Sequence, residues 1–371
     1  MTPEPVLLTP GPTPVPPEIR EELAKPLIHH RTPEFQAILK EIGEGLKALF
    51  GTTQDVFLLT SSGTGAMEAA VANLLSAGDE ALVIRGGKFG ERWGEICQAY
   101  GVQVIPIDSP WGKPLDCKEV ARKLSERPKI KAVFSTHCET STAVTYDIQG
   151  LRKAMGRSEA LLVVDTISAL LSEPFAMDAW GVDVAVSGSQ KGFMLPPGLA
   201  FIAFSPRAWD VAAHSTSPRY YFDLNLAKKA WGQTDTPFTP AISLIIGLAR
   251  ALKRIQSVGL DRILSTHRAH AEEIRQAVKR LGLELYADPA CASNAVTAVK
   301  VPPGINGKEI LKKLKEHRVI LAGGQAELAG KIFRIASMGA IGEAEIRIGM
   351  EALEKVLGDM GWKPNQGDSE K

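Results

Sequence analysis

The sequence predicts an α/β protein with two parts: a large domain with a mostly parallel seven-stranded sheet, and a smaller C-terminal α+β domain. Two observations predict this class. Short apolar runs alternate with helical segments up to about residue 204, and longer helices with fewer strands follow. A chain of 371 residues also exceeds what one hydrophobic core usually organises. We therefore expect an N-terminal segment at residues 1–20, a large domain at 21–258 and a small domain at 259–371.

Seven apolar runs have the length and composition of buried strands. They are residues 56–59, 81–84, 102–107, 130–134, 161–164, 182–186 and 199–204. Helical segments between most of them imply parallel neighbours and a sheet that is covered on both faces. Residues 187–198, which join the last two runs, are too few for a helical crossover, so we expect one antiparallel strand.

The remaining elements follow from helix caps and shorter apolar runs. Thr239 is predicted as the N-cap, and Pro240 as the first residue, of a helix that continues to about residue 255. A second helix should occupy residues 261–282. Strands are expected at 283–286, 296–301, 319–321 and 332–335, and helices at 308–317 and 342–357. The polar tail after Trp362 is expected to be disordered.

Composition excludes several classes of protein. The net charge of +1 gives no reason to expect a nucleic-acid or membrane partner. The proline-rich N-terminus does not resemble a secretory signal, and no apolar stretch is long enough to span a bilayer. The cysteines are scattered without close pairs, which argues against a metal site or a disulfide framework: Cys97, Cys117, Cys138 and Cys291. A reducing, cytoplasmic location is therefore expected.

Lys191 is the most informative residue of the chain. It ends the run SGSQK at residues 187–191, directly after a predicted buried strand. An amine that is desolvated at the end of such a strand can lose its proton and condense with an aldehyde. Pyridoxal 5'-phosphate is the aldehyde that proteins usually bind in this way. A lysine after a strand is more often a solvated loop charge, so the prediction depends on the other groups that this cofactor needs.

Two further segments supply those groups. Ser62, Gly63, Thr64, Gly65 and Ala66 lie between a strand and a helix, where backbone N–H groups and the helix dipole can bind a phosphate. Glycines there let the backbone approach an anion closely.

Asp165 ends another predicted strand, and a buried carboxylate needs a partner such as a protonated ring nitrogen. Asp165 could instead cap the next helix. One helix and one strand separate Asp165 from Lys191, so both side chains should emerge at the same edge of the sheet.

The turns after two other strands contain candidate cofactor contacts. Phe89 could stack on the cofactor ring or simply pack in the core. Thr140 could form a hydrogen bond with the cofactor hydroxyl, and His137, three residues earlier, is equally consistent with a structural role.

Together these residues resemble the class V aminotransferases of fold type I, most closely the alanine–glyoxylate and serine–pyruvate aminotransferase family. The resemblance covers nearly the whole chain. It is carried by residues 7–13 (LLTPGPT), 62–68 (SGTGAME), 164–166 (VDT), 187–191 (SGSQK) and 331–335 (KIFRI). Cysteine desulfurases of the same class typically have histidines where this chain has Phe89 and Gln190, and Cys291 is not in an obvious mobile loop.

The resemblance implies a role for each matching residue. Lys191 and Asp165 would be catalytic, with Lys191 forming the Schiff base and moving the substrate proton. Arg334 would hold the substrate carboxylate, and Gly11 would line the substrate entrance in the N-terminal segment. The cofactor contacts would be Ser62, Gly63, Thr64, Gly65, Ala66, Phe89, Thr140, Asp165, Ile167, Gln190, Lys191 and Thr236. Family members often have tryptophan at the position of Phe89.

The resemblance also implies the reaction and the assembly. It predicts ping-pong transfer of an amino group from alanine or serine to glyoxylate or pyruvate. It predicts a homodimer with each active site at the subunit interface, where Thr236, or in another register Thr239, contacts the partner's phosphate. A dicarboxylate substrate would want a second cation, for which the candidates are His29, His30, Arg31 and Arg219. Phosphonate or phosphoserine substrates would need more cations, and some relatives have been labelled as subunits of a soluble hydrogenase.

Overall fold

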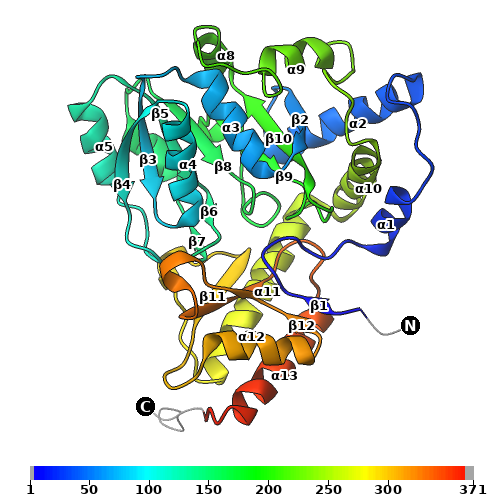
Figure 1. The fold of residues 1–371 in the computed structure, drawn as a ribbon, viewed down its shortest axis with the longest axis vertical. Helices are drawn as coiled ribbons and strands as arrows, with labels where there is room; N and C mark the ends of the chain where they lie inside the picture. The colour runs from blue at the N-terminus through cyan, green and yellow to red at the C-terminus, as the bar shows by residue number, and fades with distance from the viewer. Residues whose placement is uncertain (1–3, 364–371) are drawn as a thin grey trace.

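The computed structural model describes residues 4–363 and is built around a seven-stranded sheet (Figure 1). Its strand order is β2-β10-β9-β8-β5-β3-β4. The strands are β2 (Val56–Ser61), β3 (Glu80–Arg85), β4 (Gln103–Asp108), β5 (Ile130–Thr136), β8 (Leu161–Asp165), β9 (Val184–Gly188) and β10 (Gly198–Phe204). Only β10 runs antiparallel to its neighbours within this sheet. The mostly parallel sheet with one reversed strand is therefore confirmed.

Helices cover both faces of this sheet, because the strand residues alternate between two apolar clusters. In β2, Val56 and Leu58 pack on one face, while Phe57 and Leu59 pack on the other. The first face is covered by α1 (Pro17–Leu23), α2 (Pro33–Phe50), α5 (Cys117–Glu126), α6 (Ile148–Met155) and α10 (Ile242–Val258). The second is covered by α3 (Gly63–Leu74), α4 (Lys88–Ala99), α8 (Pro206–Ala212) and α9 (Leu224–Trp231).

The helix after Thr239 begins later than the sequence predicts. Ala241, not Thr239, is the N-cap of α10, and the first helical residue is Ile242. The backbone N–H of Ala241 donates to Thr60 Oγ1 at 3.1 Å, which ties the preceding residues to the end of β2. The assignment of Thr239 as a helix cap was therefore wrong.

The C-terminal part has its own antiparallel sheet, in the order β11-β14-β13. Its elements are β11 (Val296–Lys300), β13 (Ala322–Gly323), β14 (Ile332–Ala336), α11 (Leu260–Arg280), α12 (Gly307–Glu316) and α13 (Glu343–Asp359). The strand expected at residues 283–286 is reduced to one isolated bridge, between Leu285 and Val299. Residues 364–371, most of the tail expected to be disordered, lie outside the described residues.

The N-terminal segment crosses to the C-terminal part. β1 (Val6–Leu7) pairs in parallel with β12 (Val319–Ile320), far from it in the sequence (Figure 1). The 319–321 run therefore pairs with the N-terminus instead of joining the three-stranded sheet. Short elements complete the described chain: β6 (Cys138–Glu139), β7 (Val144–Thr145), α7 (Met177–Trp180) and the 3-10 turns Pro289–Cys291 and Ala326–Leu328. The expected domain limits at residues 20 and 258 stay a prediction.

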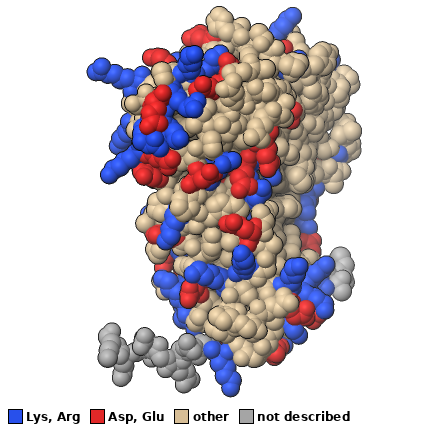
Figure 2. Space-filling model, turned by 60° about the vertical axis from the view of Figure 1, so that its left-hand side comes forward, with Lys and Arg blue, Asp and Glu red and all other residues tan. Residues whose placement is uncertain are grey.

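Charged side chains of both signs lie next to one another on the face drawn in Figure 2. This distribution agrees with the net charge of +1. No helix among residues 4–363 is long and apolar enough to cross a membrane.

Candidate active site

Lys191 lies just beyond the carboxyl end of β9, in a tight turn. Ser189 Oγ donates to Pro196 O at 2.7 Å, and the Leu195 N–H donates to Ser189 O at 3.1 Å, so the turn folds back on itself. The side chain is 8% exposed, and its Nζ donates to Pro10 O. Burial lowers the pKa of Lys191 to about 8, so a substantial fraction of the amine is neutral near that pH. This is the condition that nucleophilic attack by an amine requires.

Asp165 emerges at the same edge of the sheet, from the neighbouring strand β8. It is 4% exposed, and its Oδ1 accepts a hydrogen bond from the Ile167 N–H at 2.7 Å. Burial raises the pKa of Asp165 to about 7. A cationic partner would offset that burial, because an opposite charge favours the ionised carboxylate. The protonated nitrogen of a pyridine ring is such a partner.

The predicted phosphate turn begins α3. Ser62 is its N-cap and forms no side-chain capping bond, so it leaves the first N–H groups of the helix without a side-chain cap. A Cβ on Gly63 would lie 2.4 Å from Ile167 Cδ1, and one on Gly65 would lie 1.9 Å from Ser61 Oγ. Both positions therefore require glycine. The packing also places Ile167 against the phosphate turn.

Gln190 connects this turn with the lysine segment. A Cβ on Gly188 would lie 3.2 Å from Gln190 Oε1 and 3.6 Å from the Gly63 backbone. Among the described residues Gln190 Oε1 is a buried oxygen with no hydrogen-bond partner. A buried polar atom of this kind usually marks a missing ligand or water. The lysine motif and the phosphate turn thus lie against each other.

Arg334 approaches the site from β14. Its Nε and Nη2 donate to Gly323 O at 3.0 and 2.8 Å, and its Nη1 donates to Thr140 O at 3.0 Å. Within residues 4–363 no carboxylate lies within 4.0 Å of this guanidinium. The side chain is 5% exposed, and burial lowers its pKa to about 10. An unpaired buried cation held by carbonyls is prepared to bind an anion.

Gly11 and Thr140 lie next to these groups. Gly11 has a φ of 109°, and a Cβ there would lie 2.6 Å from Lys191 Nζ. The N-terminal segment is held in this position because Thr13 Oγ1 donates to Lys191 O at 3.0 Å. The hydroxyl of Thr140 donates to Ser168 Oγ at 2.6 Å, while its carbonyl holds Arg334.

Phe89 is the second residue of α4, and a buried carboxylate holds the start of this helix. Glu139 accepts hydrogen bonds from the backbone N–H groups of Phe89 at 3.1 Å and Gly90 at 2.8 Å. Arg92, one helical turn beyond Phe89, places its Cζ 5.0 Å from the Phe89 ring centroid. Glu139 and Arg92 are site residues that sequence reasoning did not assign. Their only signal was a position beside Thr140 and Phe89.

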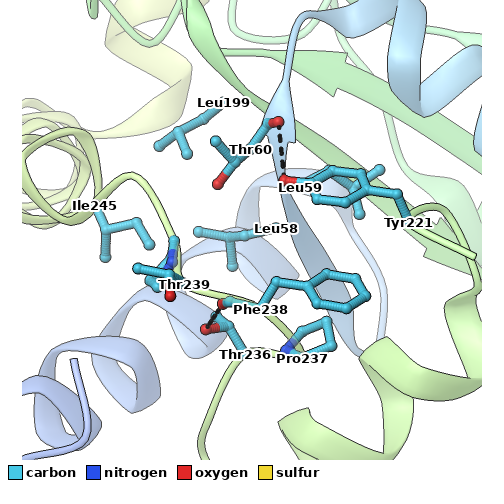
Figure 3. A pocket seen from close by; sticks show the side chains of 11 residues that line it. Leu58, Leu59, Thr60, Leu199, Tyr221, Thr236, Pro237, Phe238, Thr239 and Ile245 are labelled. Carbon is cyan, nitrogen blue, oxygen red and sulfur yellow. Dashed lines mark hydrogen bonds between the residues drawn. The ribbon is translucent and has the colours of Figure 1, made fainter.

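Thr236 lies apart from these residues, in the pocket of Figure 3 between β2 and the segment 236–240. Its side chain is buried, and its hydroxyl donates to Phe238 O at 2.8 Å. No hydrogen bond within the described chain joins Thr236 to the other predicted residues. A role for it at a phosphate therefore depends on a second subunit.

Several candidate cations and one histidine have other partners. Arg31 forms an ion pair with Asp235, and Arg219 Nη1 donates to the carbonyls of residues 72, 215 and 217. His137 is buried against Phe175 and Trp180, and burial lowers its pKa to about 4. His137 is thus a neutral core residue, as one of the two sequence readings proposed.

The residues present fit pyridoxal phosphate. A buried amine, a buried carboxylate, a glycine-lined helix N-terminus and an unpartnered amide oxygen meet at one sheet edge. No cluster of three or more potential metal ligands occurs in the part of the chain that the structure describes.

The fold and this constellation define a protein of the pyridoxal phosphate-dependent transferase class. The sequence pattern of the class V aminotransferases matches residues 9–351, and the chain belongs to that family. Its cofactor is therefore pyridoxal 5'-phosphate, and its reaction is amino-group transfer between an amino acid and a 2-oxo acid.

The chain is 43% identical over 362 residues to a soluble hydrogenase small subunit of Synechococcus sp. (strain PCC 6716). The aligned residues cover 96% of this chain and 94% of that one. It is 39% identical to L-aspartate–glyoxylate aminotransferase of Paracoccus denitrificans, over 97% of this chain and 93% of that one. The structure is similar to that of alanine–glyoxylate aminotransferase from Nostoc sp., with a TM-score of 0.92, 31% identity and 96% of each chain covered.

Proposed function

We propose that this enzyme transfers the amino group of a small amino acid, alanine or serine, to glyoxylate or pyruvate in a ping-pong reaction. The observation that carries the proposal is Arg334, a buried guanidinium without a carboxylate partner among residues 4–363. After burial, the charge of Arg334 is among the causes that lower the pKa of Lys191, so the guanidinium acts on the amine electrostatically. A planar fork in this position can bind the α-carboxylate with two hydrogen bonds.

Each residue of the site then has its own role in the proposed reaction. Bound pyridoxal phosphate supplies an aldehyde and an electron-accepting ring. Lys191 Nζ is the reacting amine and would take up and return the substrate proton. Asp165 keeps the ring nitrogen protonated. The N-terminus of α3 and the side-chain NH₂ of Gln190 would hold the phosphate, and Phe89 would stack on the ring.

The preference for small monocarboxylates rests on the other cations. Arg31 is paired with Asp235, and Arg219 is held by backbone carbonyls. Both arginines therefore already have partners within the chain, which argues against a second substrate carboxylate there. Of the four candidates this leaves the stacked pair of His29 and His30, with ring centroids 4.7 Å apart, to bind the second carboxylate of a dicarboxylate substrate. Aspartate, which is part of the name of the Paracoccus relative, is such a substrate.

The proposed active form is a cytoplasmic homodimer in which Thr236, or Thr239 in the other register, contacts the partner's phosphate. The support is the exposed aromatic surface beside this segment. Tyr220 is 74% exposed and Tyr221 is 44% exposed, and the Tyr221 ring stacks on Phe238 with centroids 5.1 Å apart. Exposed aromatic groups of this kind are typical of interfaces.

A non-catalytic, accessory role is the second candidate, because the Synechococcus relative is named as the small subunit of a soluble hydrogenase. Sulfur removal from cysteine is less consistent with the site, because Phe89 and Gln190 replace the histidines typical of desulfurases. Cys291 is also buried, in the short Pro289–Cys291 turn.

The test is spectroscopic and kinetic. The purified protein should show a visible absorption band that alanine or serine bleaches and glyoxylate or pyruvate restores. A panel of donors against glyoxylate, pyruvate and 2-oxoglutarate then names the substrates. Lys191→Ala is the control and should lose at least a hundredfold in turnover, on the order of the general acid–base contribution alone. A band that no amino acid bleaches would favour the accessory role.

A further inference from the structure

We propose that Arg92 is a positioning residue of the cofactor site: it holds Thr64 and Phe89, which lie on two different helices, in the places that the cofactor phosphate and ring require. Arg92 lies on α4, three residues after Phe89, so both side chains lie on the same face of the helix. The inference rests on the cofactor site and not on the choice of substrate.

The geometry joins Arg92 to both partners. The Arg92 Cζ lies 5.0 Å from the centre of the Phe89 ring, within the range of a cation–π interaction. Nη1 donates to Thr64 Oγ1 at 3.2 Å, at the first turn of α3. One guanidinium therefore bridges the residue expected to stack on the ring and the turn expected to bind the phosphate.

The charge of Arg92 is not neutralised by a neighbouring acid. Lys88 on the same helix pairs with Glu91, and Arg85 pairs with Asp108 at 2.7 Å. Arg92 has no carboxylate within 4.0 Å in the described chain. Burial is the main cause of the shifted pKa values of Asp165 and Lys191, and the charge of Arg92 makes a smaller contribution that opposes the rise for Asp165 and adds to the fall for Lys191.

The bond to Thr64 also sets the direction of the threonine hydroxyl. Thr64 Oγ1 accepts from Arg92, so its own O–H is free to donate elsewhere. An anion at the N-terminus of α3 is a suitable acceptor. Arg92 thus orients a phosphate donor and adds a cation near the same anion.

The experiment compares Arg92→Gln and Arg92→Lys with a matched control, Arg122→Gln. Arg122 is a helix arginine on α5 whose partner is Glu126, at 2.7 Å. The apoenzyme of each variant is titrated with pyridoxal phosphate, and the melting temperature of the apoenzyme is measured separately. Arg92→Gln should weaken cofactor binding by about tenfold or more. Arg92→Lys should recover part of this loss, because it keeps the charge without the planar fork.

The wavelength and pH dependence of the visible band give a second readout. The visible band changes when the Lys191 nitrogen loses its proton. Loss of the Arg92 charge should move this change to higher pH, because a nearby positive charge favours the unprotonated nitrogen. A double-mutant cycle with Thr64→Val should show coupling between the two positions. Arg122→Gln should change neither the affinity nor the band.

Two results would overturn the inference. One is an Arg92→Gln apoenzyme that binds the cofactor within twofold of wild type with an unshifted band. The other is a loss of affinity that merely follows a lower melting temperature of the apoenzyme. A wild-type protein that failed to bind pyridoxal phosphate would instead refute the cofactor assignment. A different substrate preference would leave the role of Arg92 intact.

Discussion

The carboxylate of Glu139 accepts a hydrogen bond from the Gly90 N–H at 2.8 Å, and so the short strand β6, which follows β5, caps helix α4. The helix's own N-cap is Gly87, which has no side chain to offer. A Cβ on Gly87 would lie 2.5 Å from the Glu139 side chain, so the glycine makes room for this remote cap. Because α4 carries Phe89 and Arg92, the position of Glu139 fixes both.

We expect Glu139→Gln to lower the free energy of unfolding by about 1–3 kcal/mol. In the wild-type protein both carboxylate oxygens accept hydrogen bonds, whereas the glutamine would turn an NH₂ group toward some of the same donors. Cofactor affinity should fall as well, because Phe89 and Arg92 move with the first turn of α4. Asn306→Ala is the matched control. Asn306 caps α12 by accepting from the Lys308 N–H at 3.0 Å, in a helix with none of the predicted site residues. Equal cofactor affinity in both variants would show that Glu139 is only a helix cap.

Asp165→Asn should separate stability from catalysis. The folded pKa of Asp165 is about 7, above its ordinary value of 3.8. In the apoenzyme the folded state therefore holds a proton that the unfolded state releases between about pH 4 and 7. The ionisation of Asp165 therefore lowers the free energy of unfolding by an amount that reaches its full size above pH 7 and is zero near pH 4.

The Asp165→Asn apoenzyme should accordingly melt at a higher temperature than wild-type apoenzyme at pH 8, with the difference shrinking toward pH 5. With cofactor bound, the same variant should lose turnover, because asparagine cannot balance a protonated ring nitrogen. Calorimetry at the two pH values and a steady-state assay give both readouts. Normal turnover in this variant would remove Asp165 from the mechanism.

The rate of cofactor association should depend on the protonation of Lys191. Only the neutral amine attacks the aldehyde, and burial lowers the pKa of Lys191 to about 8. The rate constant should therefore rise about tenfold per pH unit below that pKa and level off above it. Stopped-flow mixing of apoenzyme with pyridoxal phosphate from pH 7 to 9.5 measures this profile. A rate still rising at pH 9.5, as for a lysine with the ordinary value of 10.5, would contradict it.

Much of the site could be predicted because local sequence determines it. Lys191 and Asp165 follow apolar runs that could only be buried strands, and parallel strands bring their carboxyl ends to one edge. Glu139 could not be assigned, since its partner Gly90 is 49 residues away and the contact depends on how β6 and α4 pack. The start of α10 was misplaced because a tertiary bond to Thr60 prevailed over the local Thr–Pro signal. The proposed contact of Thr236 with a partner's phosphate would need a second chain, which a single sequence does not specify.

Arg334 provides the sharpest test of substrate recognition. If it binds the α-carboxylate, Arg334→Ala should lower kcat/KM for amino acids and 2-oxo acids by about tenfold to a few hundredfold. Arg334→Lys should recover only part, since lysine keeps the charge and loses the fork. The guanidinium already holds the carbonyls of Gly323 and Thr140, so it also has structural partners whose loss must be separated from the loss of binding.

An amine without a carboxylate separates these two effects. A binding role predicts that Arg334→Ala reacts with ethylamine at nearly the wild-type rate while its reaction with alanine falls steeply. A structural role predicts equal losses for both amines and a lower melting temperature. Single-turnover bleaching of the visible band by each amine measures the two rates on one enzyme preparation. If the rate with ethylamine fell as much as the rate with alanine, Arg334 would be a support of the fold between β14 and residue 140, and the substrate carboxylate would need another partner.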